Sequence, residues 1–261
     1  TEVKAGCIIE KVDGTTIEAG ADYFPLFEGK VGRKVVLTVY DPSTKKRFEE
    51  TVKAISYGTQ SELLYKRWVE RCTKKVEELS GGRIAYVHIK GMDSPSFRKI
   101  YSELLGRYRN KEAVVVDTRH NGGGWLHDDV VTLLSGKEYQ RIGSDPFNKW
   151  LKASCMLTCE DNYSNAHGTP YVYKTLGIGK LVGAPVAGTM TAVWWERQID
   201  PSIVFGIPQV GCMDMQGNYL ENQTLQPDIL VYNEPAASLK GEDAQLKAAV
   251  DYLLKDLSKK K

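Results

Sequence analysis

The chain has 261 residues, of which 42% are hydrophobic, and this is enough to bury the core of one large domain or two smaller ones. Its 35 lysines and arginines against 33 aspartates and glutamates leave a formal net charge of +2, which gives no electrostatic reason to expect nucleic acid or an anionic membrane as partner. No apolar run approaches the roughly 18 to 20 residues of a membrane span, and the first four residues are not those of a signal peptide. We therefore expect a soluble chain, with its compartment undecided.

Residues 1–55 are predicted to form short strands joined by turns. Segments 7–12 and 34–40 have the character of strands, and residues 47–55 supply a partner strand. Asp13-Gly14 and Asp41-Pro42-Ser43 are typical turn sequences between them. The beginning of the chain is therefore expected to be rich in β-structure.

The order of segments 4–6, 8–9, 12–14 and 32–39 resembles the second half of a PDZ domain. In that family a loop and strand near the beginning of the domain hold the carboxylate of a bound peptide, and the resemblance implies that they are missing here. Residues 1–58 are therefore expected to form an incomplete PDZ-like domain. Because an incomplete sheet has an open edge that can pair with another chain, we also expect homo-oligomers.

Between Ser61 and Leu79 apolar residues recur at helical spacing among charged ones, and Gly81-Gly82 ends the pattern. The pattern predicts a helix that connects two domains, and we assign residues 59–81 to it.

From residue 83 onward, apolar strands alternate with helices. The expected strands cover residues 84–89, 113–117, 155–158 and 180–182, and the expected helices cover 94–108, 126–134, 165–176 and 242–257, with a β-rich stretch that ends near residue 231. This alternation is typical of an α/β fold whose apolar strands are covered by helices. We assign residues 82–261 to this domain.

Five cysteines, at positions 7, 72, 155, 159 and 212, are too few and too scattered for a disulfide framework. Cys155 and Cys159 are separated by three residues, but no second pair of cysteines or histidines has matching spacing. We therefore expect buried apolar thiols and no zinc site.

A glycine-rich segment, residues 117–124, follows an apolar strand and precedes a helix, so that backbone amides can approach a ligand closely there. Three interpretations are open: a phosphate cradle, an oxyanion hole, or a tight turn. The phosphate loop requires a lysine followed by serine or threonine after the glycines, whereas Trp125-Leu126 follow here. Spacing alone does not decide between the other two.

Ser164 falls at a second turn between a strand and a helix. A serine in that place projects its hydroxyl from the sheet edge, as in nucleophile elbows, although the Gly-x-Ser-x-Gly form is absent. An isolated serine there is more often simply a helix N-cap, so only the surrounding sequence can favour the nucleophile.

Three segments in order, 119–124, 162–166 and 219–229, resemble the tricorn branch of the tail-specific (C-terminal processing) serine peptidases. The resemblance is close over residues 83–232 and implies an α/β core of the crotonase/Clp-protease-like type. It also implies a peptide or protein substrate cleaved by acyl transfer, and neither a metal nor an organic cofactor.

The resemblance gives roles to particular residues. The nucleophile of the family falls on Ser164, and one oxyanion-hole amide falls on Asn165. The other oxyanion-hole amide falls on Gly123, with Gly122 as the less favoured donor. A glutamate that helps to polarise the tricorn site falls on Glu221.

The general base does not fall on this chain. In the processing branch a lysine after a Thr-x-Gly turn takes the serine proton, but residues 186–191 contain no lysine and Lys180 lies on the preceding strand. In the tricorn branch the base is a histidine that lies before the PDZ domain, so the resemblance places it upstream. His167, three residues after Ser164, is expected at the surface.

We therefore expect a serine peptidase that is inactive as this fragment, because a serine without a base is a weak nucleophile. One alternative is a non-catalytic peptide-binding module with PDZ-like and peptidase-like parts. A second is an acyl-thioester enzyme of the crotonase fold, although nothing in the sequence marks a nucleotide-phosphate site.

Overall fold

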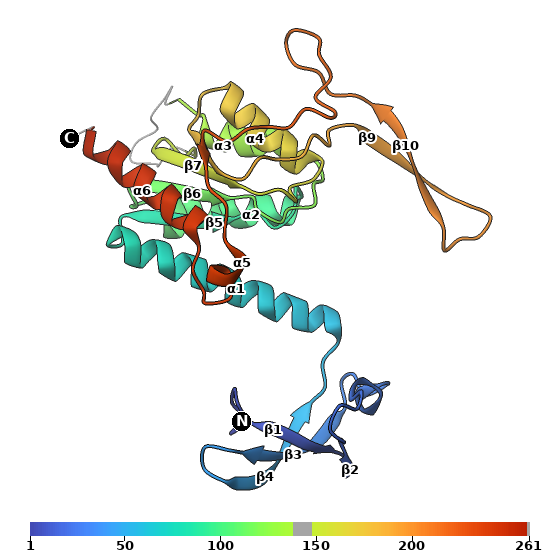
Figure 1. Cartoon of the computed structure of the whole chain (residues 1–261). Coiled ribbons are helices and arrows are strands. Elements are labelled where there is room, and N and C mark those ends of the chain that lie inside the picture. The colour runs from blue at the N-terminus through green and yellow to red at the C-terminus, as the bar shows by residue number, and fades with distance from the viewer. Residues whose placement is uncertain (138–147, 260–261) are drawn as a thin grey trace. The chain divides into compact units, whose positions relative to one another are not determined.

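The computed structural model describes residues 1–137 and 148–259 (Figure 1). They form two compact units, Thr1–Trp68 and Val69–Lys261. The segment in which a connecting helix is predicted forms α1 (Tyr57–Ser80), and the boundary between the units falls within this helix. Each unit is described separately.

The N-terminal unit is built on a four-stranded antiparallel sheet of order β2-β1-β3-β4. Its elements are β1 (Ile8–Val12), β2 (Thr15–Thr16), the short 3-10 helix η1 (Phe24–Phe27), β3 (Lys34–Asp41) and β4 (Lys46–Lys53). Alternate residues of β3 point into a small core, in which Val35 and Val39 are fully buried beside Val12. The three strands predicted from the sequence lie within two residues of the observed ones.

The C-terminal unit contains a five-stranded parallel sheet of order β11-β8-β7-β6-β5. Its strands are β5 (Ile84–His88), β6 (Ala113–Asp117), β7 (Ala153–Thr158), β8 (Lys180–Gly183) and β11 (Ile229–Leu230). Every residue of β5 and β6 is buried, as expected when helices cover both faces of a parallel sheet. The predicted α/β fold with a parallel sheet is therefore confirmed.

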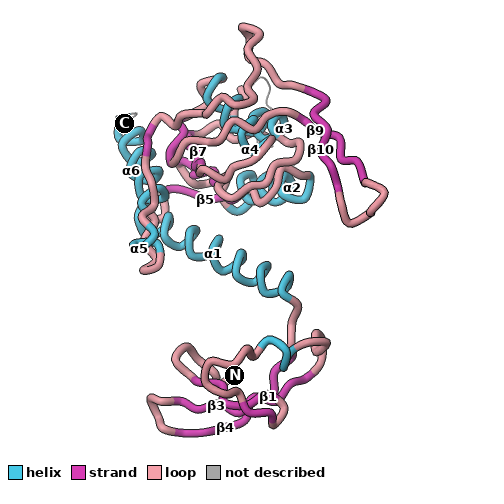
Figure 2. Tube along the Cα trace, turned by 45° about the vertical axis from the view of Figure 1, so that its right-hand side comes forward, coloured by secondary structure: helices cyan, strands magenta, loops and turns pink. Residues whose placement is uncertain are grey.

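Helices cover the two faces of this sheet (Figures 1 and 2). They are α2 (Ser94–Ser102) with the π-helical turn η2 (Glu103–Arg107), α3 (His127–Leu134), α4 (Asn165–Thr175), the short α5 (Pro235–Ser238) and α6 (Ala244–Lys259). Side chains of α2, α3 and α4 share one apolar core with the sheet, whereas α6 packs on β6, β7 and β8. The single helix predicted over 94–108 is thus interrupted, and Gly106, a poor helix former, lies in the π-helical turn.

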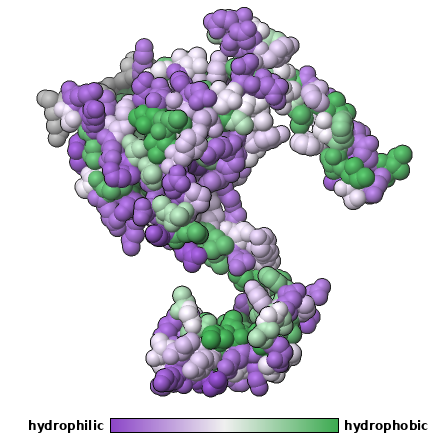
Figure 3. Space-filling view, in the orientation of Figure 1, coloured by the Kyte–Doolittle hydropathy of each residue, from purple (hydrophilic) through white to green (hydrophobic). Residues whose placement is uncertain are grey.

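The β-rich stretch before residue 231 is mainly a hairpin of β9 (Ala192–Arg197) and β10 (Val204–Val210), which extends away from the body of the C-terminal unit (Figure 1). Consecutive residues of a strand point to opposite faces, and the consecutive Trp194 and Trp195 are both exposed. Figure 3 shows apolar residues along this hairpin. Among the described helices of the whole chain, none is both long and apolar enough to cross a bilayer.

Candidate active site

The two turns singled out by the sequence lie at the same edge of the sheet. The glycine turn (residues 118–124) follows β6, and the serine turn (residues 159–164) follows β7, and these neighbouring strands are parallel. The carboxyl ends of parallel strands are where α/β proteins build their sites. The amide of Tyr163 donates to the carbonyl of Asn121 at 3.0 Å, so the turns are also bonded to each other.

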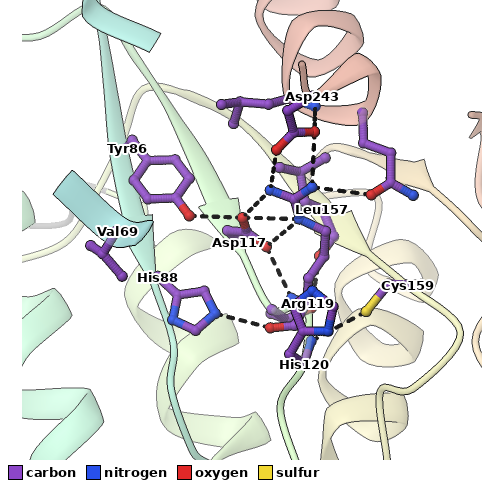
Figure 4. Close-up of polar contacts among 12 residues, drawn as sticks. Val69, Tyr86, His88, Asp117, Arg119, His120, Leu157, Cys159 and Asp243 are labelled. Atoms are coloured by element: carbon purple, nitrogen blue, oxygen red, sulfur yellow. Dashed lines mark hydrogen bonds and ion pairs between the residues drawn. The ribbon is translucent and has the colours of Figure 1, made fainter. Parts of the chain in front are cut away.

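A buried ion network fixes the start of the glycine turn (Figure 4). Arg119 and Asp117 are 2% and 0% exposed, and the guanidinium donates to the Asp117 carboxylate at 2.7 Å and to Asp243 at 3.0 Å. The hydroxyl of Tyr86 donates to Asp117 at 2.8 Å. Burial opposes ionisation of Asp117, but the charge of Arg119, its hydrogen bonds to the carboxylate and the nearby His88 together outweigh it and hold the pKa of this carboxyl below its ordinary value. The ion pairs and hydrogen bonds of Asp117 and Arg119 therefore fix the backbone at the start of the glycine turn.

Asn121 organises the glycines themselves. Its side chain is fully buried, with Nδ2 donating to the carbonyl of Ile89 and Oδ1 accepting from the amide of Gly123, each at 2.8 Å. Gly123 has φ +92°, and a Cβ built on it would lie 2.8 Å from the Cβ of Ser164. Only glycine permits this approach of the two turns. Gly123 thus lies beside Ser164 as the resemblance implies, but its amide donates to Asn121.

Ser164 has backbone angles of φ 55° and ψ −121°, a strained combination for a residue other than glycine. It occupies the N-cap position of α4, yet its side chain makes no capping hydrogen bond. Ser164 is therefore the N-cap residue by position, but its hydroxyl does not cap the helix, and its positive φ is of the kind that a nucleophile elbow requires. The Ser164 amide donates to Oγ1 of Thr189 at 3.2 Å, and its hydroxyl makes no hydrogen bond to the residues that the structure describes.

Asn165 is the first residue of α4, where backbone amides have no partner within the helix and the helix dipole is positive. Its amide donates to none of residues 1–137 and 148–259. Its side chain is buried, and Oδ1 accepts from the amides of Leu126 and His127 at 2.8 and 3.1 Å. The side chain therefore anchors the serine turn to the start of α3 and leaves the amide as a hydrogen-bond donor.

Glu221 is not part of the serine turn; it is hydrogen-bonded to the loop at residues 190–191. Its Oε2 accepts from the amides of Met190 and Thr191, each at 2.7 Å. Burial opposes its ionisation, but the amide of Thr191 and its neighbours keep the pKa of Glu221 below the ordinary value. Because Thr189 of the same loop accepts from the Ser164 amide, Glu221 and Ser164 are both hydrogen-bonded to residues 189–191.

Lys180 does not approach the serine turn through any hydrogen bond among the described residues. It lies on β8, is half exposed, and pairs with Asp228 at 3.1 Å. Asp228 also accepts from the amide of Leu181 at 2.9 Å, and this bond ties the segment just before β11 to β8.

The four histidines all lie in the described residues, and no imidazole among them is hydrogen-bonded to Ser164; the backbone amide of His167 donates to the Ser164 carbonyl at 2.7 Å, as in a helix turn. His88 contacts the carbonyl of Arg119 and His127 contacts Asn165, each at 2.9 Å. His120 contacts Asp161 at 2.9 Å, and this pair is taken up below.

The prediction that His167 is exposed is wrong, because its side chain is only 1% exposed. The first turns of α4 are buried, and Met190 packs against them at Gly168. Nδ1 of His167 has no partner among the described residues. Burial lowers the pKa of this imidazole, which the nearby Glu221 carboxylate only partly opposes. His167 is therefore a buried neutral ring.

Sequence reasoning missed three groups that hold the site together: Asn121, Thr189 and the link from Arg119 to Asp243. Asn121 and Arg119 belong to the Asp-x-Arg-x-Asn pattern of the glycine turn, so the sequence did contain a signal for these two residues. Asp243 is 124 residues from Arg119, and no local pattern indicates that contact.

The chain is similar to known proteins over most of its length. The model of Peptidase family S41 matches residues 83–231. The tricorn protease of Thermoplasma acidophilum is 25% identical over 263 residues, covering 97% of this chain and 24% of that protein. Tricorn protease homolog 1 of Streptomyces coelicolor is 28% identical over 257 residues, covering 95% and 24%.

A crystal structure of the tricorn protease matches the fold with a TM-score of 0.79 and 24% identity, over 97% of this chain and 25% of that one. The chain spans about a quarter of the length of these curated relatives.

Proposed function

Because the chain belongs to peptidase family S41, we propose that it hydrolyses peptide bonds as the catalytic part of a tricorn-like serine peptidase, with an acyl-enzyme at Ser164. The resemblance to the tricorn branch that the motifs indicated is confirmed by the relatives. The observation that carries the proposal is the strained backbone of Ser164 at the start of α4, without a capping bond.

In the proposed reaction, Oγ of Ser164 attacks the carbonyl carbon of a peptide bond, and the carbonyl oxygen becomes an oxyanion. The amide of Asn165, at the positive end of α4 and without a partner among the described residues, is one donor to that oxyanion. The amide of Gly123 is the other, and for this it must be shared with or released by Asn121. One such donor contributes about 2.7 to 4 kcal/mol to transition-state stabilisation. The general base takes the Ser164 hydroxyl proton and gives it to the departing amine, which leaves an acyl-serine that water hydrolyses.

We propose that Glu221 is a positioning residue and that the general base lies outside these 261 residues. Glu221 holds the loop that bonds the Ser164 amide, and no hydrogen bond joins it to Ser164 itself within the described residues. Since no imidazole of the four histidines is hydrogen-bonded to Ser164, the Ser164 hydroxyl of the chain alone should react slowly as a nucleophile. This supports the expectation that the fragment by itself is inactive.

For the N-terminal unit we propose a PDZ-like part that recognises or gates peptide, because its antiparallel sheet has the strand content expected of residues 1–58. The substrate is then a peptide or protein, in keeping with the relatives that are named proteases.

The alternative is a module that binds peptide without cleaving it. The strained backbone of Ser164 argues against a module that only binds peptide, because peptide binding does not require a serine at positive φ, whereas a nucleophile elbow does.

A fluorophosphonate probe tests the proposal. In the protein purified from its source, the adduct should be found by mass spectrometry on Ser164, and Ser164→Ala should abolish it. Replacement of the exposed Ser202 on the hairpin by Ala is the matched control and should leave labelling unchanged. An adduct on another serine would overturn the assignment.

A further inference from the structure

Three side chains with metal-binding donor atoms meet beside the two turns. They are His120 of the glycine turn, and Cys159 and Asp161 of the serine turn. One donor atom from each, the imidazole nitrogen, the sulfur and a carboxylate oxygen, all lie within 4.8 Å of one another. Sγ of Cys159 is 2.7 Å from Oδ1 of Asp161, and Nδ1 of His120 is 2.9 Å from Oδ2. None of the three belongs to the proposed catalytic set.

The backbone is arranged to hold this cluster. His120 has φ +62°, an uncommon angle for a residue other than glycine, and its amide donates to Sγ of Cys159 at 3.2 Å (Figure 4). Partners bonded to the ligating atoms are what orient ligands in protein metal sites. Oδ1 of Asn162 lies 3.1 Å from the same sulfur, and its Nδ2 is fixed by Thr118. The sulfur therefore has a defined position and defined neighbours.

The donor set selects the ion. A thiolate, an imidazole and a carboxylate together are typical ligands of zinc, which binds them at about 2.3 Å for sulfur and about 2.0 to 2.2 Å for nitrogen and oxygen. Tetrahedral geometry then separates the ligand atoms by roughly 3.3 to 3.6 Å. Small outward movements of the three side chains suffice to reach this arrangement from the observed contacts. The side chains of His120 and Asp161 are 62% and 63% exposed, so an ion can enter from solvent.

We propose that His120, Cys159 and Asp161 form a zinc-binding site that joins the glycine turn to the serine turn. On binding, the Cys159 thiol releases its proton to solvent, a zinc–sulfur bond forms, and coordination replaces the hydrogen bonds that Asp161 makes to the other two side chains. Water completes the tetrahedron. His120 precedes Gly123 by three residues and Asp161 precedes Ser164 by three, so a bound ion fixes both turns from one side.

The test measures metal binding directly and does not depend on peptidase activity. The whole chain is reduced, stripped with a chelator, and titrated with Zn²⁺ in a calorimeter and with Co²⁺ in a spectrophotometer. One equivalent of zinc should bind, and cobalt should produce a thiolate-to-metal charge-transfer band that zinc abolishes. A chain that binds no stoichiometric zinc, or binds cobalt without that band, would overturn the proposal.

Variants locate the site. His120→Asn keeps a residue that tolerates positive φ and should lower zinc affinity by at least about 100-fold, as should Cys159→Ser, since even outer partners of a metal site are worth 10- to 100-fold. His120 is exposed, so this variant remains informative if Cys159→Ser fails to fold. The control is Cys212→Ser, a half-buried cysteine outside the cluster, which should bind zinc as the parent chain does. Undiminished binding by His120→Asn would refute the site.

Discussion

Replacement of Gly123 by alanine should separate the two turns, whereas the same replacement of its neighbour Gly122 should not. A methyl group on Gly123 would lie 2.8 Å from Cβ of Ser164 and 2.8 Å from the carbonyl oxygen of Tyr163. Neither atom belongs to a flexible chain end, so one turn must move. Gly123 also has φ +92°, whereas Gly122 does not have a positive φ, and a methyl group on it would meet no described atom within 4 Å.

The magnitude follows from these two effects. The left-handed backbone alone costs an alanine roughly 1 to 2 kcal/mol, and the contact adds to it, so Gly123→Ala should destabilise the C-terminal unit by about 2 kcal/mol or more. For a unit of this size the melting temperature should fall by about 4 to 8 °C. Gly122→Ala should stay within about 0.5 kcal/mol of the parent protein.

The same pair of variants tests the proposed oxyanion hole. Both replacements keep the backbone N–H, so only its position changes. Displacement of one oxyanion donor should slow turnover, or fluorophosphonate labelling of Ser164, by roughly 10²- to 10³-fold in Gly123→Ala, with little effect in Gly122→Ala. Thermal unfolding and labelling rates are measured side by side in the protein purified in its native form. If Gly123→Ala matches the parent in both, the close approach of the turns has no role in stability or reactivity.

Other variants test the surroundings of the site. Glu221→Gln should keep the fold and lower kcat by roughly 10²-fold with little change in KM. Asp228→Asn, in contrast, should lower the melting temperature more than it lowers kcat. If Glu221→Gln and the parent protein have equal kcat, Glu221 has no role in the mechanism. Arg119→Leu should destabilise by about 3 to 5 kcal/mol near neutral pH, because it leaves the buried Asp117 carboxylate unpaired. In the parent protein the pKa of Asp117 is depressed, so the stabilisation from this pair is present above the ordinary aspartate pKa and is lost only as pH falls through the lower folded value. Denaturant unfolding should therefore show the difference between variant and parent shrinking in acid, and a deficit that grows in acid would contradict the ion-pair explanation. The isolated 261-residue chain should label at Ser164 slower by orders of magnitude than the native protein, and equal rates in time-resolved mass spectrometry would show that a base lies within the chain.

Local patterns predicted the elements of the C-terminal unit well where burial is continuous. The strand expected over 113–117 is observed there as β6, because a fully buried run of apolar residues ends where the polar glycine turn begins. The helix expected over 165–176 is observed as α4 within one residue. The parallel pairing of β6 with β7 then accounts for why Gly123 and Ser164, 41 residues apart, lie together.

Contacts made by loops could not be predicted in this way. Glu221 reaches the amides of Met190 and Thr191 only because the chain returns beside that loop, and no periodicity describes this return. His167 has a polar side chain on a helix, which favours exposure, but the loop with Met190 covers that part of α4. The spacing of Cys159 to Cys155 drew attention to the wrong partner, since the side chains that meet Cys159 come from His120 and Asp161.

The hairpin of β9 and β10 has a thermodynamic consequence. A two-stranded sheet with water on both faces is marginally stable by itself, and its tryptophans bury little surface when it forms. Its opening free energy should therefore be far below that of the buried strands β5 to β7, whose amides are released only by global unfolding. In a native-state hydrogen-exchange experiment the hairpin amides should exchange first, and a protease of broad specificity should cut there before it cuts the sheet.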